Sequence, residues 1–299
     1  MNFSFKSSGW KTFLFLILAA LSHDGFSYIH NFETTRLKST GGAGAASMLV
    51  EEATLLNPAS IAFFEITSIY FQKANVQTTK NDRDTTDNDQ IGFVVSDSNP
   101  SISGSLSYLN HSEGDGKRKR FSISAATSLG KSSAMGIAYR ITKDKYFDHG
   151  LETSKDDFNQ VVLGVTHAIN ESLSFGVVVN DPQKKRKEDS TYILGMQYVY
   201  AGFLSLMADA GAPLSKTGTT QLFYKMALQF KILDDFYFRV GTFNDKFLGE
   251  KGNGIGLGWV QPKLGIELAA KNTTNFARPE LSRQKSSIKD ASLSLSFRF

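Results

Sequence analysis

The chain has 299 residues, no cysteine and a formal net charge of +4. The lack of cysteine excludes disulfides and thiolate sites for metal or nucleophilic chemistry, and so small and dispersed a charge gives no reason to expect a nucleic-acid partner. The mean hydropathy of −0.21 fits a water-soluble protein, but also a membrane β-barrel, whose polar lumen face offsets its apolar outer face.

The N-terminus has the pattern of a secretory signal peptide. Two lysines precede a short apolar run, Thr12–Leu21, and small residues then allow cleavage after Ser22 or after Ser27. This run is about half the roughly 20 apolar residues that a membrane helix needs. We therefore predict that residues 1–27 direct export; a buried helix or an uncleaved anchor is the alternative.

The segment that follows, residues 28–66, has a character of its own. It is rich in glycine and alanine at first, then acidic, and it contains an Asn-Pro pair. A short helix is expected around Val50–Leu56, ended by a turn at Asn57-Pro58. Small residues would let its backbone pack closely inside a narrow space.

From residue 67 onward the chain is a series of strand-like segments of about eight to eleven residues, the length that a tilted strand needs to cross a bilayer. One of the clearest, Leu222–Phe230, has an apolar residue at every second position, with Lys225 and Gln229 on the opposite face. Short turns alternate with longer polar loops, which we expect at 78–89, 110–119, 143–157, 181–189, 211–218, 244–251 and 271–290. Membrane barrels alternate tight periplasmic turns with long outward loops in this way.

Five charged residues of the strand-like segments fall on the face opposite the apolar one. They are Arg140, Lys225, Arg239, Glu267 and Arg298. A lysine or arginine facing lipid at mid-membrane would cost about 2–4 kcal/mol, so this placement favours a barrel over a soluble sandwich. The sequence therefore predicts an all-β fold, a transmembrane antiparallel β-barrel of about fourteen strands, over residues 67–299, with the five charged residues lining its lumen.

The last nine residues, Ala291–Phe299, alternate between one apolar and one polar face. They resemble the terminal insertion signal of bacterial outer-membrane barrels, with Phe297 and Phe299 as its aromatic residues. That resemblance implies the barrel-assembly machinery as a partner. An edge strand of a soluble sheet is the alternative. In a barrel, this segment would pair with Thr67–Val76, and Arg298 would lie where carboxylates of residues 28–66 could reach it.

Residues 28–66 also carry a family resemblance. Gly41–Ser47, Glu51-Glu52-Ala53 and Asn57-Pro58-Ala59 together resemble the N-terminal motif of the FadL-type outer-membrane transporters, and PorV-like barrels share a similar opening. The resemblance implies a hatch that folds into the lumen, with Glu51, Glu52, Asn57 and Pro58 as its residues. The two glutamates would pair with basic lumen residues, because an unpaired interior charge is costly. A periplasmic lead-in that docks under the barrel is the alternative.

Other patterns point to no chemistry. The glycines of Gly252–Gly258 recur at every second residue, which suits the lumen face of a strand that makes room for the hatch and not a nucleotide loop. The five histidines lack ligand spacing, and we expect no metal, no cofactor and no enzymatic activity. The basic runs Lys117–Arg120 and Lys184–Lys187 are solvated loop tips or contacts for lipopolysaccharide phosphates.

The function expected from these features is an outer-membrane channel for small hydrophobic compounds, as in FadL-type proteins. The alternative is a non-transporting barrel that serves as a structural or secretion partner, as PorV-like proteins do; a general diffusion porin ranks third. Each of these functions implies export to the outer membrane of a Gram-negative bacterium, with lipid and lipopolysaccharide as neighbours.

Overall fold

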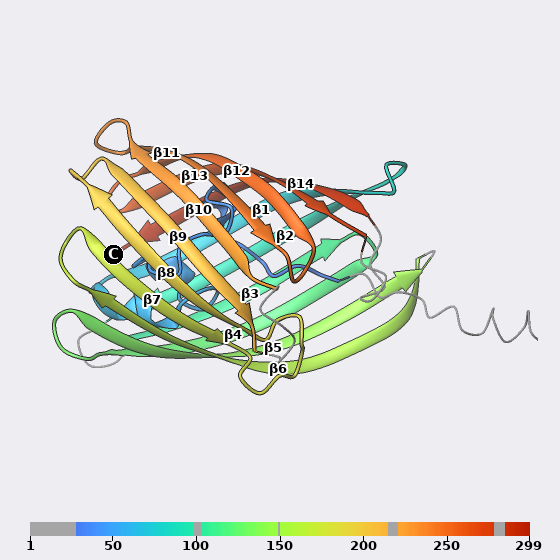
Figure 1. Ribbon diagram of the computed structural model, residues 1–299, viewed down its shortest axis with the longest axis horizontal. Helices are drawn as coiled ribbons and strands as arrows, with labels where there is room; N and C mark the ends of the chain where they lie inside the picture. Colours follow the sequence, from blue (N-terminus) through green and yellow to red (C-terminus); the bar gives the residue numbers. More distant parts are fainter. Residues whose placement is uncertain (1–27, 99–102, 149, 215–220, 278–284) are drawn as a thin grey trace, which may run out of the picture.

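The structure is a computed structural model that describes residues 28–98, 103–148, 150–214, 221–277 and 285–299; the predicted signal peptide lies outside them. Within these ranges, fourteen antiparallel strands close into one barrel, as Figure 1 shows. The predicted fold class is confirmed. The strands are β1 (Thr67–Lys80), β2 (Asp84–Asp97), β3 (Ser103–Glu113), β4 (Gly116–Ser128), β5 (Ser133–Asp148), β6 (Leu151–Ala168), β7 (Leu173–Asn180), β8 (Thr191–Tyr200), β9 (Leu204–Pro213), β10 (Phe223–Lys231), β11 (Phe236–Asp245), β12 (Glu250–Val260), β13 (Leu264–Asn275) and β14 (Ser286–Arg298).

The barrel closes where the first strand meets the last. β1 and β14 pair over their whole length, with Ile69 opposite Phe297, and the Phe299 amide donates to the Thr67 carbonyl at 2.9 Å. Closure leaves no strand edge with unpaired backbone groups, which lipid would penalise. The expected pairing of the C-terminal strand with Thr67–Val76 is therefore confirmed.

The two faces of the wall differ as the alternation predicts. On β3, Leu106 and Tyr108 are each 45% exposed on the outside, whereas Ser105 and Ser107 are buried on the lumen side. Large apolar side chains are exposed on the outside of the other strands as well, among them Phe71, Phe121, Ile137 and Leu257. An apolar outer surface of this extent is suited to lipid contact.

Three of the predicted long loops are wrong. The segments 78–89, 110–119 and 143–157 are mostly strand, because the hairpins β1–β2, β3–β4 and β5–β6 continue well past the apolar belt and turn only at their tips. They project from one end of the barrel in Figure 1. Most side chains on both faces of these extensions are polar, so the extensions lack the apolar–polar alternation that marks a membrane strand. The loop between β7 and β8 is present as predicted.

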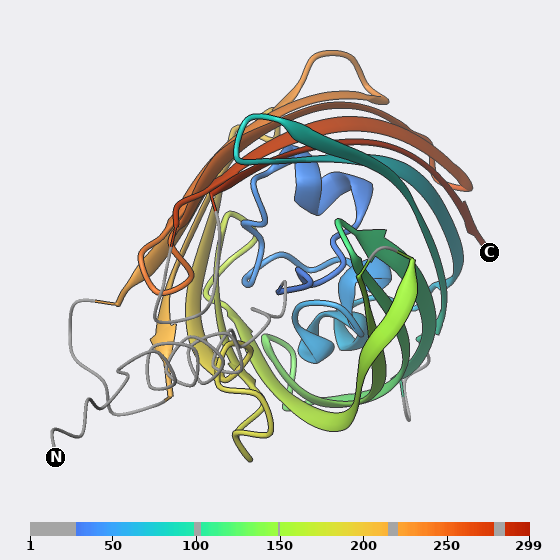
Figure 2. The ribbon, with the colours of Figure 1, turned by 90° about the vertical axis from the view of Figure 1, so that its right-hand side faces the viewer.

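Residues 28–66, which we call the inner segment, run inside the barrel, where they are drawn in blue in Figure 2. They contain one α-helical turn, α2 (Thr35–Ser39), and two 3-10 helices, η1 (Val50–Glu52) and η2 (Pro58–Phe63). The predicted helix over Val50–Leu56 is wrong, since only its first three residues are helical and turns follow. Among the described residues no helix is long and apolar enough to cross a bilayer.

Candidate functional site: the barrel lumen

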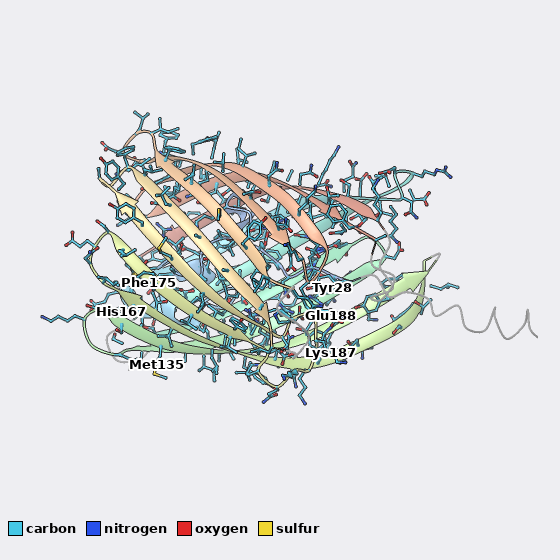
Figure 3. All side chains as sticks on the ribbon, in the orientation of Figure 1. Tyr28, Met135, His167, Phe175, Lys187 and Glu188 are labelled. Carbon is cyan, nitrogen blue, oxygen red and sulfur yellow. The ribbon has the colours of Figure 1, made fainter. Side chains whose placement is uncertain are left out.

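The inner segment spans the lumen from end to end. Its first residue, Tyr28, lies at the same end of the molecule as Lys187 and Glu188 of the β7–β8 loop, and His167 lies at the opposite end, in Figure 3. The segment leaves the lumen at that opposite end and joins β1 at Thr67. On the way α2 contacts β11, β12, β13 and β14, and η2 contacts β3, β4, β5 and β6. The segment therefore touches both sides of the barrel.

Lumen-facing glycines give the inner segment its space. A Cβ added to Gly254 would lie 1.9 Å from the Lys38 carbonyl oxygen, and one added to Gly136 would lie 2.5 Å from the Pro58 carbonyl carbon. Both distances are shorter than any van der Waals contact, so a larger residue would force the segment away. The prediction that the glycines of Gly252–Gly258 make room for this segment is confirmed at Gly254.

The adjacent carboxylates Glu51 and Glu52 have different partners. Glu51 accepts two hydrogen bonds from the Arg298 guanidinium, at 2.8 and 3.0 Å, and so connects the segment to the last strand. Glu52 pairs with Arg36 at 2.5 Å, within the inner segment itself. Only the first pair matches the expectation of a basic partner on the wall. Glu52 instead joins two parts of the inner segment, which makes the segment a folded unit.

Asn57 and Pro58 start a helical turn, whereas the sequence predicted that they end one. Pro58 is the first residue of η2, and the Asn57 Oδ1 accepts from the Ala59 amide at 3.0 Å as its cap. The Asn57 Nδ2 donates to the Ala45 carbonyl at 2.7 Å and to the Thr166 hydroxyl on β6 at 2.9 Å. One buried side chain thus connects the cap, the glycine-rich stretch and the wall.

Two of the basic residues predicted for the lumen, Arg140 and Lys225, lie on the inner face and bind backbone carbonyl oxygens. Arg140, on β5, donates to the carbonyl oxygens of Thr54 and Leu55, the shortest contact being 2.8 Å. Lys225, on β10, donates to the Gly42 carbonyl at 3.3 Å. Both residues thereby bind the backbone of the inner segment.

Arg239 and Glu267 form an ion pair of 2.7 Å with each other. They lie on β11 and β13, two strands apart, and Gly258 of β12 lies between them, because it pairs with Glu267 and a Cβ there would touch the Arg239 guanidinium. This pair stabilises the wall and makes no hydrogen bond to the inner segment within the described residues.

Sequence reasoning missed several contacts between the segment and the wall. Asp209, on β9, accepts hydrogen bonds from the amides of Gly44 and Ala45 at 2.8 and 3.0 Å. Two further ion pairs, each of 2.5 Å and partly buried, join Glu33 to Lys271 and Lys38 to Asp290. The strand alternation places these wall residues on the lumen face, but nothing in the sequence identifies their partners.

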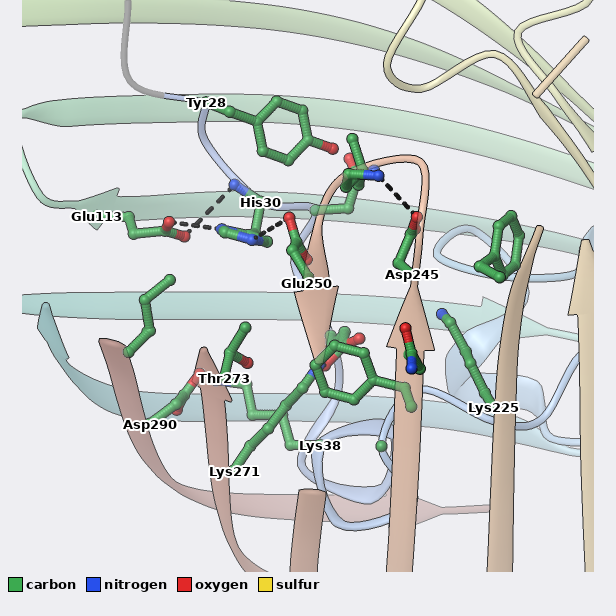
Figure 4. Close-up of a pocket in the computed structure, with 18 of the residues that line it drawn as sticks. Tyr28, His30, Lys38, Glu113, Lys225, Asp245, Glu250, Lys271, Thr273 and Asp290 are labelled. Carbon is green, nitrogen blue, oxygen red and sulfur yellow. Dashed lines mark hydrogen bonds and ion pairs between the residues drawn. The ribbon is translucent and has the colours of Figure 1, made fainter. Parts of the chain in front are cut away.

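His30 lies between two carboxylates at the end of the lumen where the extended hairpins project. Its Nδ1 lies 2.5 Å from Glu113 and its Nε2 lies 2.8 Å from Glu250, as Figure 4 shows. Burial lowers the pKa of His30, but the two carboxylates outweigh burial and raise it to about 9. His30 is therefore an imidazolium at neutral pH and connects β3 to β12.

Two small cavities adjoin the inner segment. One, of about 150 Å³, lies beside His30, and most of its lining residues are polar or charged, including Lys225, Asp245 and Lys271; Figure 4 shows their arrangement. The other, of about 140 Å³, is lined by apolar and by charged residues. The apolar ones are Phe32, Leu37, Leu55, Leu56, Ile193 and Phe223, and the charged ones include Arg140, Asp189 and Lys225. Phe223 and Lys225 line both cavities, which therefore lie close together.

The C-terminal aromatic residues lie outside the lumen. The ring of Phe297 is 46% exposed on the outer face and that of Phe299 is 77% exposed at the end of the chain. The basic residues Arg118 and Arg120, from one of the predicted surface runs, instead face the lumen and are buried: Arg118 pairs with Asp144 at 2.7 Å. That run therefore supplies fewer surface cations than the sequence suggests.

No protein-family model matches the chain, and no curated protein matches it. Solved structures do. A deltaS2S3 mutant of the TodX monoaromatic hydrocarbon channel has a TM-score of 0.68 at 11% identity, over 89% of this chain and 99% of that one. The CymD monoaromatic hydrocarbon channel has a TM-score of 0.65 at 10% identity, over 89% and 97%.

The Pseudomonas putida toluene transporter TodX has a TM-score of 0.61 at 9% identity, over 88% of this chain and 96% of that one. At such identities the similarity is one of fold. At that level the expected resemblance to FadL-type channels is confirmed.

Proposed function

We propose that this chain is an outer-membrane channel for small hydrophobic compounds and that the inner segment is its hatch. The barrel shares its fold with the hydrocarbon channels TodX and CymD, and its outer face is apolar, as a membrane barrel requires. Glu51, Asn57 and Pro58 are the hatch residues that contact the wall, and Glu52 holds the hatch together.

The observation that carries this proposal is the partly apolar cavity beside the inner segment. Its volume of about 140 Å³ is close to that of an apolar protein cavity of about 150 Å³ that binds benzene. A single aromatic ring fits such a space, whereas an extended long-chain fatty acid does not. The substrate class we propose is therefore compounds of one ring or similar size.

In this proposal the solute enters at the end of the lumen where the extended hairpins project. It passes the polar residues around His30, reaches the cavity and leaves when the inner segment shifts. The hydrogen bonds from Arg140 and Lys225 to the backbone of the segment are then the contacts that must loosen. Arg140 binds two carbonyl oxygens and Lys225 binds one. Each such hydrogen bond from a charged donor is worth about 1.5–3 kcal/mol, so these contacts can break during transport.

The test fills the cavity and leaves the rest of the barrel alone. Ile193→Phe adds volume at a buried residue of the cavity wall, and Leu194→Phe makes the same kind of change at the next residue, which is 54% exposed on the outer face. Uptake of a radiolabelled monoaromatic compound is measured in proteoliposomes with lipopolysaccharide in the outer leaflet. We expect Ile193→Phe to reduce uptake strongly and Leu194→Phe to match the wild type. Equal uptake by both variants, or by wild-type and protein-free vesicles, contradicts the proposal.

The second candidate function is a non-transporting barrel that binds a protein partner. It is favoured by the three extended hairpins, which present a large polar surface beyond the apolar belt, and by the ion pairs that hold the inner segment in place. Recovery of a stoichiometric protein partner from native membranes in mild detergent, together with absent uptake, would support this function over the first.

A further inference from the structure

A long hollow lies on the outside of the wall, across β11, β12, β13, β14 and β1. It consists of two adjoining parts of about 690 and 670 Å³ that share Asn75, Ile255, Ala270 and Ala291. We call this the wall groove. It is separate from the lumen cavities, because its shared side chains lie on the outer face of their strands.

Strand pairing arranges the groove in three rows. The middle row runs Asn75, Ala291, Ala270, Ile255, Val240, each residue paired with the next on the neighbouring strand. Its two central alanines are small, and larger side chains flank them on both sides. Ala291 and Ala270 line both parts of the hollow, as expected where small side chains leave space between larger ones.

The rows on either side of the alanines differ in chemistry. The row on the side of the C-terminus and the start of β1 is apolar except at one end: Lys73, Leu293, Leu268, Leu257 and Phe238. The row on the side of the extended hairpins is polar: Gln77, Lys289, Asn272, Asn253 and Thr242. From one row to the next, along the strand direction, the wall changes from apolar to polar, as it does where a barrel leaves the hydrocarbon of a bilayer.

Two lysines on this surface are without a carboxylate partner. Lys73 and Lys289 are exposed, and within the described part of the chain neither ammonium is within ion-pair distance of a carboxylate. Lys73 lies between Leu293 and Ile91 on the neighbouring strands, an apolar setting in which a lysine extends its charge toward the headgroups. The pairing pattern places two carboxylates of β2 beside this surface, Asp89 opposite Asn75 and Asp87 opposite Gln77.

We propose that the wall groove binds a phosphorylated glycolipid of the outer leaflet, of the lipid A type. An acyl chain lies over the leucines, and phosphate groups pair with Lys73 and Lys289. The amides of Asn272 and Asn253 bind sugar hydroxyls. The groove is on the outer-leaflet side because its polar row faces the extended hairpins, away from both the C-terminus and the start of β1.

The separation of the two lysines favours a headgroup with two phosphates. Lys289 pairs with Gln77, four residues along β1 from Lys73, which is roughly 13 Å along the strand. A glycerophospholipid has its phosphate at one point, whereas a bisphosphorylated disaccharide carries one at each end. This proposal does not depend on transport, because nothing in it passes through the lumen.

The test measures lipid retained by the purified barrel. Wild type, the double variant Lys73→Gln/Lys289→Gln and the control Lys119→Gln/Lys143→Gln are purified from outer membranes in mild detergent; the control residues are exposed and oppose each other on β4 and β5. Lipid A per barrel is measured by mass spectrometry. We expect about a tenfold loss in the groove variant, because it removes two charge-assisted contacts, and no loss in the control.

A second variant, Ala270→Leu/Ala291→Leu, fills the groove without changing its charge. It should lose lipid A as well, and heat-modifiable migration on gels shows that each variant is folded. Equal retention by all variants overturns the proposal, and so does retention of a glycerophospholipid in place of lipid A. A barrel dimer that the alanine variant dissociates, with no lipid lost, also overturns it.

Discussion

At the residue scale, His30 is the clearest case of a side chain whose charge depends on the fold. Its pKa is raised from the usual 6.5 to about 9 by Glu113 and Glu250. A group whose pKa is higher in the folded state stabilises the fold fully below its unfolded pKa, and this contribution is lost as the pH rises through the folded value. The stabilisation by His30 is therefore lost as the pH rises from about 6.5 to about 9.

We predict that His30→Gln lowers the thermal midpoint of the barrel in detergent more at pH 6 than at pH 10, because only the imidazolium gains from the two carboxylates. The measurement is the difference in midpoint between wild type and variant across that range. His167→Gln, a change at an exposed residue near the opposite end of the barrel, is the control and should show no such dependence. A difference in midpoint between wild type and His30→Gln that does not change with pH would contradict the raised pKa of His30.

A second residue-scale prediction concerns Asn57. The variant Asn57→Ala removes the cap of η2 and leaves the Ala45 carbonyl and the Thr166 hydroxyl without their donor. We expect a loss of about 1–3 kcal/mol in the free energy of unfolding, since buried polar groups lose their partner. Urea unfolding in micelles measures it. Asn180→Ala removes a hydrogen bond between wall residues alone and should cost less; equal costs would argue against a special role for Asn57.

At the scale of elements, the sequence predicts the strands where one face meets lipid and the other the lumen. Leu222–Phe230 is recognisable because every second residue is apolar and forms an unbroken apolar face. The extension of β1 to Lys80 is not, since both of its faces are polar and strand and loop then have the same composition. The helix α2 was not predicted, because all five of its residues are buried. It therefore lacks the contrast between an apolar and a polar face that marks an amphipathic helix.

The end of β14 allows a prediction about assembly. The Phe299 ring is 77% exposed, and the bond from its amide to Thr67 survives a change of side chain. Phe299→Ala should therefore leave the stability of the folded barrel nearly unchanged. If the ring is an insertion signal, the same variant lowers the amount of folded barrel in the outer membrane. Phe236→Ala, at another exposed outer-face ring, is the control; similar yields for both variants would exclude the signal.

At the scale of the whole molecule, residue positions could be predicted but their partners could not. The alternation places Arg140, Arg239 and Arg298 on one face, yet one binds backbone carbonyls, one a wall glutamate and one a glutamate of the inner segment. These partners depend on strand register and on the path of the inner segment, and neither is encoded in local periodicity. Lys73 is an exception to the prediction that charged strand residues face the lumen, because it lies on the outer face.

The inner segment and the barrel wall contribute differently to the molecule, and this leads to the last prediction. The wall is closed by a complete ladder between β1 and β14 that involves no residue of the segment. Removal of residues 28–60 should therefore leave a barrel that assembles, while water enters the lumen and hydrates Arg140, Lys225 and Arg298. Planar-bilayer recordings should then show a large, steady ion conductance where the full chain shows little. The control, Arg239→Gln/Glu267→Gln, breaks a wall pair and should stay closed. A truncated barrel that is folded by heat-modifiable migration but does not conduct would show that the inner segment is not what blocks the lumen.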